Sequence, residues 1–146
     1  MATLERAIEI AAKNHTGQKD KGGEPYILHP LRVMMGVRGE NEKIAAVLHD
    51  VVEDTSITLD DLRREGFADA IVRAVDALTK RPGETRLDAG RRAAADPIAR
   101  KVKLSDLADN MNLTRLGNPT EKDLARLREY EAVRALLLAE EERSKR

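Results

Sequence analysis

The apolar residues of this chain recur every three or four positions almost from end to end. In the first segment Leu4, Ala7, Ile8 and Ala11 share one helical face, which predicts a helix over roughly residues 3–15. Glycine and proline separate the periodic segments, and no stretch alternates convincingly between apolar and polar residues as a half-buried strand would. The pattern predicts an all-α fold, a single helical bundle of about six to eight helices.

Local start and stop signals place several of these helices. Asn41 is a plausible N-cap for the segment that begins NEKIAAV. Thr58 and Gly66 are expected to begin and end a short helix, because a hydroxyl suits the N-cap and glycine the C-terminal end. Asp96 followed by Pro97 predicts the start of a longer helix, since proline is favoured in the first turn.

Size and composition indicate one folded domain. The 146 residues suffice for a sizeable core, and we expect a single domain over residues 1–146 because no linker or repeat divides the chain. Hydrophobic residues make up 41% but aromatic residues only 2%, so the core must be built from Leu, Val, Ile, Ala and Met. The absence of cysteine excludes disulfides, thiolate metal sites and cysteine nucleophiles.

The charge pattern narrows the classes of partner. Lys plus Arg equals Asp plus Glu at 26 each, so the net charge offers no sign of nucleic-acid binding. No apolar run is long enough to cross a bilayer, and the first ten residues carry charges where a signal peptide would be apolar. We therefore expect a cytoplasmic protein that binds neither nucleic acid nor membrane, with homo-oligomerisation left open.

Residues 48–54 read LHDVVED, which places one histidine and three carboxylates among apolar residues. On one continuous helix, at about 100° per residue, His49, Asp50, Glu53 and Asp54 would share less than half of the circumference. No Lys or Arg follows at the spacing of a helical ion pair, so a surface helix stabilised by salt bridges explains the segment poorly. The alternative is an ordinary helix end, with Asp54 capping the next element.

Two more residues are candidates for the same site. His29 precedes Pro30 at the start of an expected helix, and Asp106 lies on an otherwise apolar one. Two histidine nitrogens and two aspartate oxygens suit a divalent transition metal such as Mn²⁺, Fe²⁺ or Zn²⁺. Glu53 and Asp54 would then be available to a bound water. Spacing alone does not bring these residues together, because a lone histidine there is often an N-cap and such an aspartate often caps a neighbouring element.

The order of these residues resembles that of the HD-domain metal-dependent phosphohydrolases, and the surrounding segments narrow the resemblance. HTGQKDKGGEPYILHPLRV, AAVLHDVVEDTSIT, VDALTK and VKLSDLADNM are similar to the hydrolase domain of the RelA/SpoT family over roughly residues 5–115. Those enzymes remove the 3′-pyrophosphate of the alarmones ppGpp and pppGpp. The chain is too short to include the family's synthetase and regulatory domains, so it resembles the stand-alone small alarmone hydrolases.

The resemblance implies a complete site. The implied ligands of one metal ion, usually Mn²⁺ in this family, are His29, His49, Asp50 and Asp106. The implied pair that activates and positions the attacking water is Glu53 and Asp54. The implied substrate contacts are Lys21, Lys80 and Asn110, and Tyr130 is a weaker match to a pocket tyrosine.

Two departures from the family concern substrate recognition. The family commonly has Arg-Lys before its SGEPY segment, and that arginine packs against the guanine base, whereas this chain has Asp20-Lys21. A carboxylate cannot supply the flat cationic surface on which a purine stacks. Asn112 stands where an arginine is usual. We therefore expect the metal and water machinery to follow the family and base recognition to differ.

The function expected from the sequence is metal-dependent hydrolysis of the 3′-pyrophosphate of (p)ppGpp-type nucleotides to GDP or GTP and pyrophosphate. One alternative keeps the metal centre and changes the substrate to an adenosine alarmone, the 2′-phosphate of NADPH or a nucleoside monophosphate. The other is a non-catalytic nucleotide-binding helical domain. That alternative predicts a missing metal ligand or a lost acidic pair, and the sequence retains both.

Overall fold

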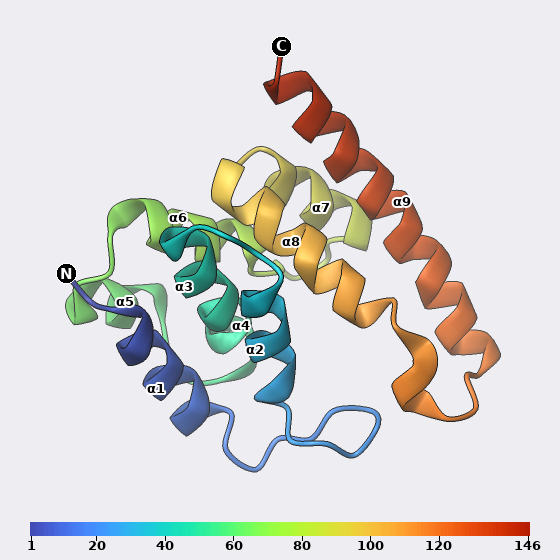
Figure 1. Ribbon diagram of the computed structural model, residues 1–146, viewed down its shortest axis with the longest axis horizontal. Helices are drawn as coiled ribbons and strands as arrows, with labels where there is room; N and C mark the ends of the chain where they lie inside the picture. Colours follow the sequence, from blue (N-terminus) through green and yellow to red (C-terminus); the bar gives the residue numbers. More distant parts are fainter.

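The computed structural model describes residues 1–146 apart from the side chain of Arg115, and the all-α prediction is confirmed (Figure 1). In chain order the elements are α1 (Leu4–Asn14), α2 (Leu28–Met35), α3 (Glu40–Leu48), α4 (Val51–Asp54), α5 (Leu59–Glu65), α6 (Asp69–Leu78), α7 (Arg86–Ala94), α8 (Pro97–Asn110), the 3₁₀ turn η1 (Leu113–Leu116) and α9 (Glu121–Ser144). The first helix lies where its apolar spacing predicts it.

The centre of the fold is α3, which contacts α1, α2, α6 and α8. Its residues 44–48 are all buried, and they pack among Val33 of α2, Val72 of α6 and Val102 of α8. This core consists of aliphatic side chains, with Phe67 as a buried aromatic member, as the low aromatic content predicts. Because α3 is enclosed on several sides, the residues at its C-terminal end are held by the core itself.

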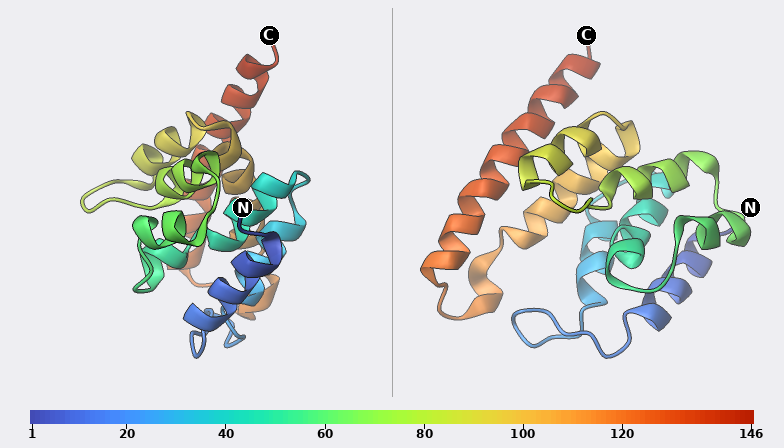
Figure 2. Two further views of the ribbon diagram at one scale, coloured as in Figure 1. Left: turned by 90° about the vertical axis from the view of Figure 1, so that its left-hand side faces the viewer. Right: turned by 180° about the vertical axis from the view of Figure 1, so that it is seen from behind.

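A second, smaller cluster joins α7 and α8 to the long helix α9. Ala94, Leu107, Val133 and Leu137 are its buried members. At Gly90 an added Cβ would lie 2.8 Å from a methyl carbon of Val133, so the contact between α7 and α9 requires a residue without a side chain there. The C-terminal end of α9 extends beyond the rest of the bundle (Figures 1 and 2).

Most of the local helix signals are confirmed. Thr58 and Asp61 form a reciprocal capping box at the start of α5, and Gly66 ends that helix with a φ of 92°. The Asp96 side chain accepts hydrogen bonds from two backbone N–H groups of the first turn of α8. The Asn41 N-cap is wrong, because α3 begins earlier, with Gly39 as its N-cap.

The expectation of one continuous helix through residues 48–54 is also wrong. α3 ends at Leu48, and α4 begins at Val51 after a turn formed by His49 and Asp50. In a continuous helix the carbonyl of Ala46 would accept the N–H of Asp50. It instead lies 2.6 Å from Nδ1 of His49 and 3.4 Å from the His49 backbone nitrogen. The histidine side chain therefore competes for the carbonyl at which the helix ends.

Across the described residues, no helix combines the length and the apolar character that crossing a bilayer requires.

Candidate active site

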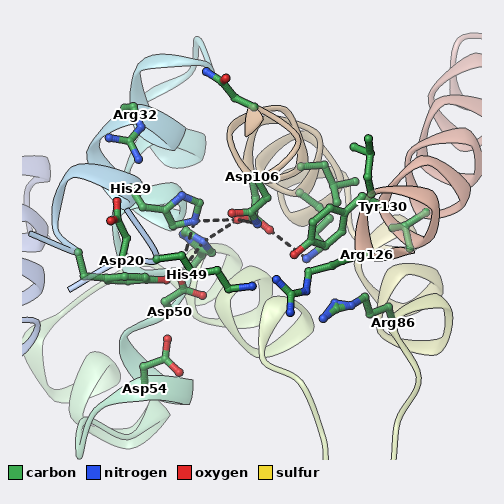
Figure 3. A pocket seen from close by; sticks show the side chains of 18 of the residues that line it. Asp20, His29, Arg32, His49, Asp50, Asp54, Arg86, Asp106, Arg126 and Tyr130 are labelled. Atoms are coloured by element: carbon green, nitrogen blue, oxygen red, sulfur yellow. Dashed lines mark hydrogen bonds and ion pairs between the residues drawn. The ribbon is translucent and has the colours of Figure 1, made fainter. Parts of the chain in front are cut away.

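A pocket of about 500 Å³ lies between the bundle and α9. Its walls come from the loop before α2, the turn between α3 and α4, the loop between α6 and α7, and the facing sides of α8 and α9. Figure 3 shows His29, His49, Asp50 and Asp106 gathered at one end, with Arg86, Arg126 and Tyr130 across the pocket from them. The described residues thus form a pocket with an acidic and histidine-rich end facing a cationic one.

The structure brings together all four residues that the sequence predicts as metal ligands. Nε2 of His29 lies 2.9 Å from Oδ1 of Asp106 and 3.8 Å from Oδ2 of Asp50. Nε2 of His49 lies 3.0 Å from the same Asp50 oxygen and 3.3 Å from the same Asp106 oxygen. Two imidazole nitrogens and two carboxylate oxygens therefore converge on one small volume. We call these four residues the ligand cluster.

The chemistry of the ligand cluster fits a divalent cation. Nδ1 of His49 faces the carbonyl of Ala46, which can only accept, so the ring proton belongs on Nδ1 and the lone pair on Nε2. That Nε2 is buried and forms no well-aligned hydrogen bond, although two carboxylate oxygens lie close to it. A buried lone pair directed at anionic oxygens is unfavourable without a positive charge between them. A metal ion bound by nitrogen and oxygen ligands supplies that charge.

The electrostatics of the ligand cluster support the same interpretation. Burial alone would lower the pKa of His29, but its hydrogen bonds to Asp106 and Asp109 outweigh burial and raise the pKa to about 9. Burial alone would raise the pKa of Asp106, yet the ammonium group of Lys103 and both imidazoles hold it well below its usual range. Several carboxylates and two imidazoles thus share one buried volume, and a divalent cation bound there would balance their charge.

Glu53 and Asp54 lie beside the ligand cluster, at the more exposed edge of the pocket. Carboxylate oxygens of Asp50, Glu53 and Asp54 lie within 4.8 Å of one another. Burial, with repulsion from Asp50 and Glu53, raises the pKa of Asp54 to about 6. Oε1 of Glu53 accepts a hydrogen bond of 2.8 Å from the backbone N–H of Lys80. The α6–α7 loop therefore orients Glu53 and leaves its second oxygen available to the pocket.

The predicted substrate contacts all line the pocket, but they differ in what holds them. Lys21 lies in the exposed loop before α2, and Lys80 lies in the α6–α7 loop. Asn110 donates from Nδ2 to Oδ1 of Asp106 over 3.2 Å, so it contacts the ligand cluster directly. Lys80 contacts Glu53 through its backbone N–H and not through its side chain. A backbone contact of this kind cannot be predicted from the residue types in the sequence.

The two departures from the family pattern have local structural roles. Oδ1 of Asp20 accepts hydrogen bonds of 2.9 Å from the backbone N–H groups of Gly22 and Glu24, which closes the loop before α2. The side chain of Asn112 accepts the backbone N–H of Thr114 at the start of η1. Both residues also line the pocket. Asp20 therefore offers the pocket a carboxylate that is already engaged on one oxygen.

Several residues that contact the ligand cluster were not predicted from the sequence. The hydroxyl of Tyr26 donates to Oδ2 of Asp50, and Nζ of Lys103 lies 3.0 Å from Oδ2 of Asp106. Asp109 contacts Nδ1 of His29. Lys103 and Asp109 each lie three residues from Asp106 on α8, so helical spacing was a usable signal for both. Tyr26 is joined to Asp50 only by the tertiary fold.

The cationic end of the pocket is formed by α7 and α9. The guanidinium of Arg86 lies 5.2 Å from the centre of the Tyr130 ring, and its Nε lies 2.9 Å from Oε2 of Glu129. Arg126 also lines the pocket, one turn before Tyr130 on α9. Arginine and tyrosine together offer both positive charge and a flat surface, and these suit a phosphorylated aromatic ligand.

Comparison with known proteins identifies the family. A family model described as HD domain matches residues 7–142. The chain is 38% identical over 125 residues to a GTP pyrophosphokinase of Streptomyces coelicolor, an alignment that covers 77% of this chain and 15% of that protein. It is 36% identical over 120 residues to a guanosine-3′,5′-bis(diphosphate) 3′-pyrophosphohydrolase of Aquifex aeolicus, covering 74% of this chain and 17% of that one. The chain thus spans less than a fifth of these relatives.

A relative of similar length comes from Mus musculus. This guanosine-3′,5′-bis(diphosphate) 3′-pyrophosphohydrolase, MESH1, is 33% identical over 142 residues, which are 88% of this chain and 79% of the mouse protein. A solved structure described as a metazoan ortholog of SpoT that hydrolyses ppGpp superposes with a TM-score of 0.78 at 24% identity, covering 94% of this chain and 86% of that one, and it shares the fold. With a family model that matches most of its length and a relative of which it covers 79%, this chain belongs to the HD-domain family.

Proposed function

We propose that this protein is a metal-dependent hydrolase that cleaves the 3′-pyrophosphate of (p)ppGpp-type nucleotides, releasing pyrophosphate and GDP or GTP. The observation that carries the proposal is the convergence of the ligand cluster with Glu53 and Asp54 in one pocket. Relatives that carry the name of this activity support the choice of substrate.

The ligand cluster would hold the metal, with Mn²⁺ as the ion that the family resemblance favours. A divalent ion bound there lowers the pKa of a water molecule and neutralises charge on a phosphoryl group. Tyr26 and Lys103 would keep the carboxylates of Asp50 and Asp106 in place, because each donates to the oxygen of its partner aspartate.

Glu53 would act as the general base. Its Oε1 is held by the backbone N–H of Lys80, so its other oxygen can take a proton from the attacking water. Asp54 would orient that water from the adjacent position. The water oxygen bonds to the inner phosphorus of the 3′-pyrophosphate, the bond from that phosphorus to the ribose 3′-oxygen breaks, and the 3′-oxygen leaves with a proton as a hydroxyl group.

The cationic side chains would bind the substrate's phosphates. An acidic Glu53/Asp54 pair repels a polyanion unless positive charges around it compensate. Lys21, Lys80, Arg86 and Arg126 line the same pocket and are positioned to do so. Asn110, which contacts Asp106, would complete the substrate contacts near the ligand cluster.

The second candidate is the same chemistry on a nucleotide with a different base, and Asp20 favours it. In place of a guanidinium, the loop before α2 presents a carboxylate bonded to its own backbone. An adenosine alarmone or the 2′-phosphate of NADPH would then compete with (p)ppGpp as substrate.

Product analysis of the purified, Mn²⁺-loaded protein tests both candidates. The substrates are ppGpp, pppGpp, a pApp-type adenosine nucleotide and NADPH. Pyrophosphate release that is fastest from ppGpp or pppGpp supports the first proposal, and faster turnover of an adenosine substrate supports the second. Absence of turnover with all four would overturn both. We also propose that residues 1–146 act as one domain, since α7 and α8 contribute buried residues to both core clusters.

A further inference from the structure

The two histidines of the ligand cluster are oriented by different means. His49 presents Nε2 to the cluster because its Nδ1 faces the backbone carbonyl of Ala46. His29 also presents Nε2, but its Nδ1 lies 2.6 Å from Oδ2 of Asp109, a side chain. A neutral imidazole carries one proton, so a ring that binds a metal through Nε2 must carry that proton on Nδ1. For His29 the group that accepts it is the Asp109 carboxylate.

Asp109 is in turn held by an arginine. Nε of Arg32 lies 2.6 Å from Oδ1 of Asp109, and its Nη2 lies 3.1 Å from Oδ2. Two parallel N–H···O bonds from a planar guanidinium fix the plane of a carboxylate. The Asp109 side chain is 10% exposed, whereas Arg32 at 36% keeps contact with solvent. The carboxylate that faces His29 is therefore both largely buried and oriented.

These contacts form a closed arrangement across two helices. His29 and Arg32 are three residues apart on α2, and Asp106 and Asp109 are three residues apart on α8. Each end of the His29 ring meets one aspartate, Asp106 through Nε2 and Asp109 through Nδ1. Helical spacing brings each pair onto one face, so α2 and α8 meet through matched side chains.

The same two helices are packed tightly one turn further along. Oγ of Ser105 donates to the backbone carbonyl of Val33 over 2.8 Å. A Cβ added at Gly36 would lie 2.2 Å from that hydroxyl oxygen, so the backbone of α2 approaches α8 too closely for a larger residue. The distance between Asp109 and His29 is thus set by packed helices as well as by the hydrogen bond.

We propose that Asp109, oriented by Arg32, is a positioning residue that keeps His29 in the ring orientation and protonation pattern needed to bind the metal through Nε2. The inference rests on the metal site proposed above. Loss of such a supporting carboxylate typically weakens metal affinity by about 10- to 100-fold. An ion pair that merely tied α2 to α8 would have no such effect.

The test is the affinity of the full chain for Mn²⁺, measured by calorimetry after chelation, in four variants. Asp109→Ala removes the acceptor and should weaken Mn²⁺ binding by about 10- to 100-fold. Asp109→Asn should do nearly the same, because its amide can donate to Nδ1 and so place the ring proton on Nε2. Arg32→Ala leaves the Asp109 carboxylate in place as the acceptor but no longer fixes its orientation. We expect a smaller loss of Mn²⁺ affinity than for either Asp109 variant.

The matched control is Glu65→Ala. The two carboxylate oxygens of Glu65 accept hydrogen bonds from the guanidinium of Arg6, both of 2.8 Å. This bidentate pair joins α1 to α5, away from the ligand cluster. Its removal should leave Mn²⁺ affinity unchanged. Thermal unfolding of each metal-free variant separates loss of metal affinity from loss of fold, and Asp109→Asn, similar in shape to the parent side chain, serves if the alanine variant does not fold.

The outcomes separate this inference from the proposed function. Parent-like Mn²⁺ affinity in both Asp109 variants would overturn the positioning role and leave the hydrolase proposal standing. Failure of the parent protein to bind Mn²⁺ would overturn the metal site and this inference with it. The expected order of affinity loss supports the inference even if none of the tested nucleotides is a substrate, because the readout is metal binding alone.

Discussion

The two ends of the pocket are built differently. The ligand cluster is held by α2, by the turn after α3 and by α8, and its side chains are at most 16% exposed. The opposite wall and edge, which we call the cationic rim, consist of exposed or half-exposed lysines and arginines on loops, α7 and α9: Lys21, Lys80, Arg86 and Arg126. Groups packed into a core have fixed positions, whereas exposed or half-exposed groups, on loops or on the outer faces of helices, can be exchanged with less repacking.

This contrast assigns different tasks to the two ends. Under the proposed function, the cluster would determine whether phosphoryl chemistry takes place, and the rim would determine which anion is bound. Substitutions in the cluster should therefore act on turnover and metal binding with large effects. Substitutions in the rim should act on KM with small effects, and an exception in either direction would break the comparison.

The largest effect is expected for Asp50→Ala. The change removes one of two carboxylates shared by His29 and His49, so metal binding should become undetectable. Loss of several kcal/mol of transition-state stabilisation corresponds to a fall in turnover of about 10³-fold or more. Activity assays and Mn²⁺ calorimetry measure both. A folded variant with parent-like activity would exclude Asp50 from the metal site.

A smaller effect, confined to turnover, is expected for Glu53→Gln. The glutamine carbonyl can still accept the backbone N–H of Lys80, so the side chain keeps its place but cannot take a proton. Loss of a general base lowers kcat by about 10²- to 10⁴-fold. Mn²⁺ affinity should stay at the parent value, which distinguishes Glu53 from the ligand cluster. Equal losses of kcat and metal affinity would instead place Glu53 among the ligands.

The rim is tested by Arg126→Ala. A hydrogen bond from a charged group contributes about 1.5–3 kcal/mol, so removing one phosphate contact should raise KM by about tenfold or more. The value of kcat and the Mn²⁺ affinity should be retained. The parent KM should also rise with salt, since half-exposed charges are screened. A variant with unchanged KM and a large fall in kcat would move Arg126 from binding into catalysis.

The sequence predicted those features that depend on neighbouring residues. The caps at Thr58 and Asp96 are local hydrogen bonds, so they follow from residue type and position. The Asn41 cap failed because Gly39, two residues earlier, begins the helix instead. The prediction of a continuous helix through His49 failed because a side chain that competes for a backbone carbonyl leaves the apolar periodicity of the sequence unchanged.

The members of the ligand cluster were predicted by family resemblance, because their spacing in the sequence does not specify that they meet. His29 and Asp106 are separated by 77 residues, and only the resemblance indicated their contact. The support around them was less predictable still. Tyr26 reaches Asp50 across 24 residues and Asp109 reaches His29 across 80, and no local pattern specifies such contacts. Helical spacing on α8 would have singled out Asp109 only after Asp106 was placed.

The smallest effect is expected for substitution of Asp20, the position at which the sequence suggested altered recognition of the base. In Asp20→Asn the amide oxygen can still accept the N–H groups of Gly22 and Glu24, so the loop should keep its shape while losing the charge. The interaction of a partly exposed charge with the substrate is screened by solvent and contributes at most about 1 kcal/mol. The KM for ppGpp should therefore change by less than about fivefold. Asp20→Ala is the contrasting variant, because it removes the loop acceptor as well. If Asp20→Asn instead reverses the preference between ppGpp and an adenosine alarmone, the Asp20 carboxylate contacts the base directly. The view that the cations of the rim alone select the substrate would then be wrong.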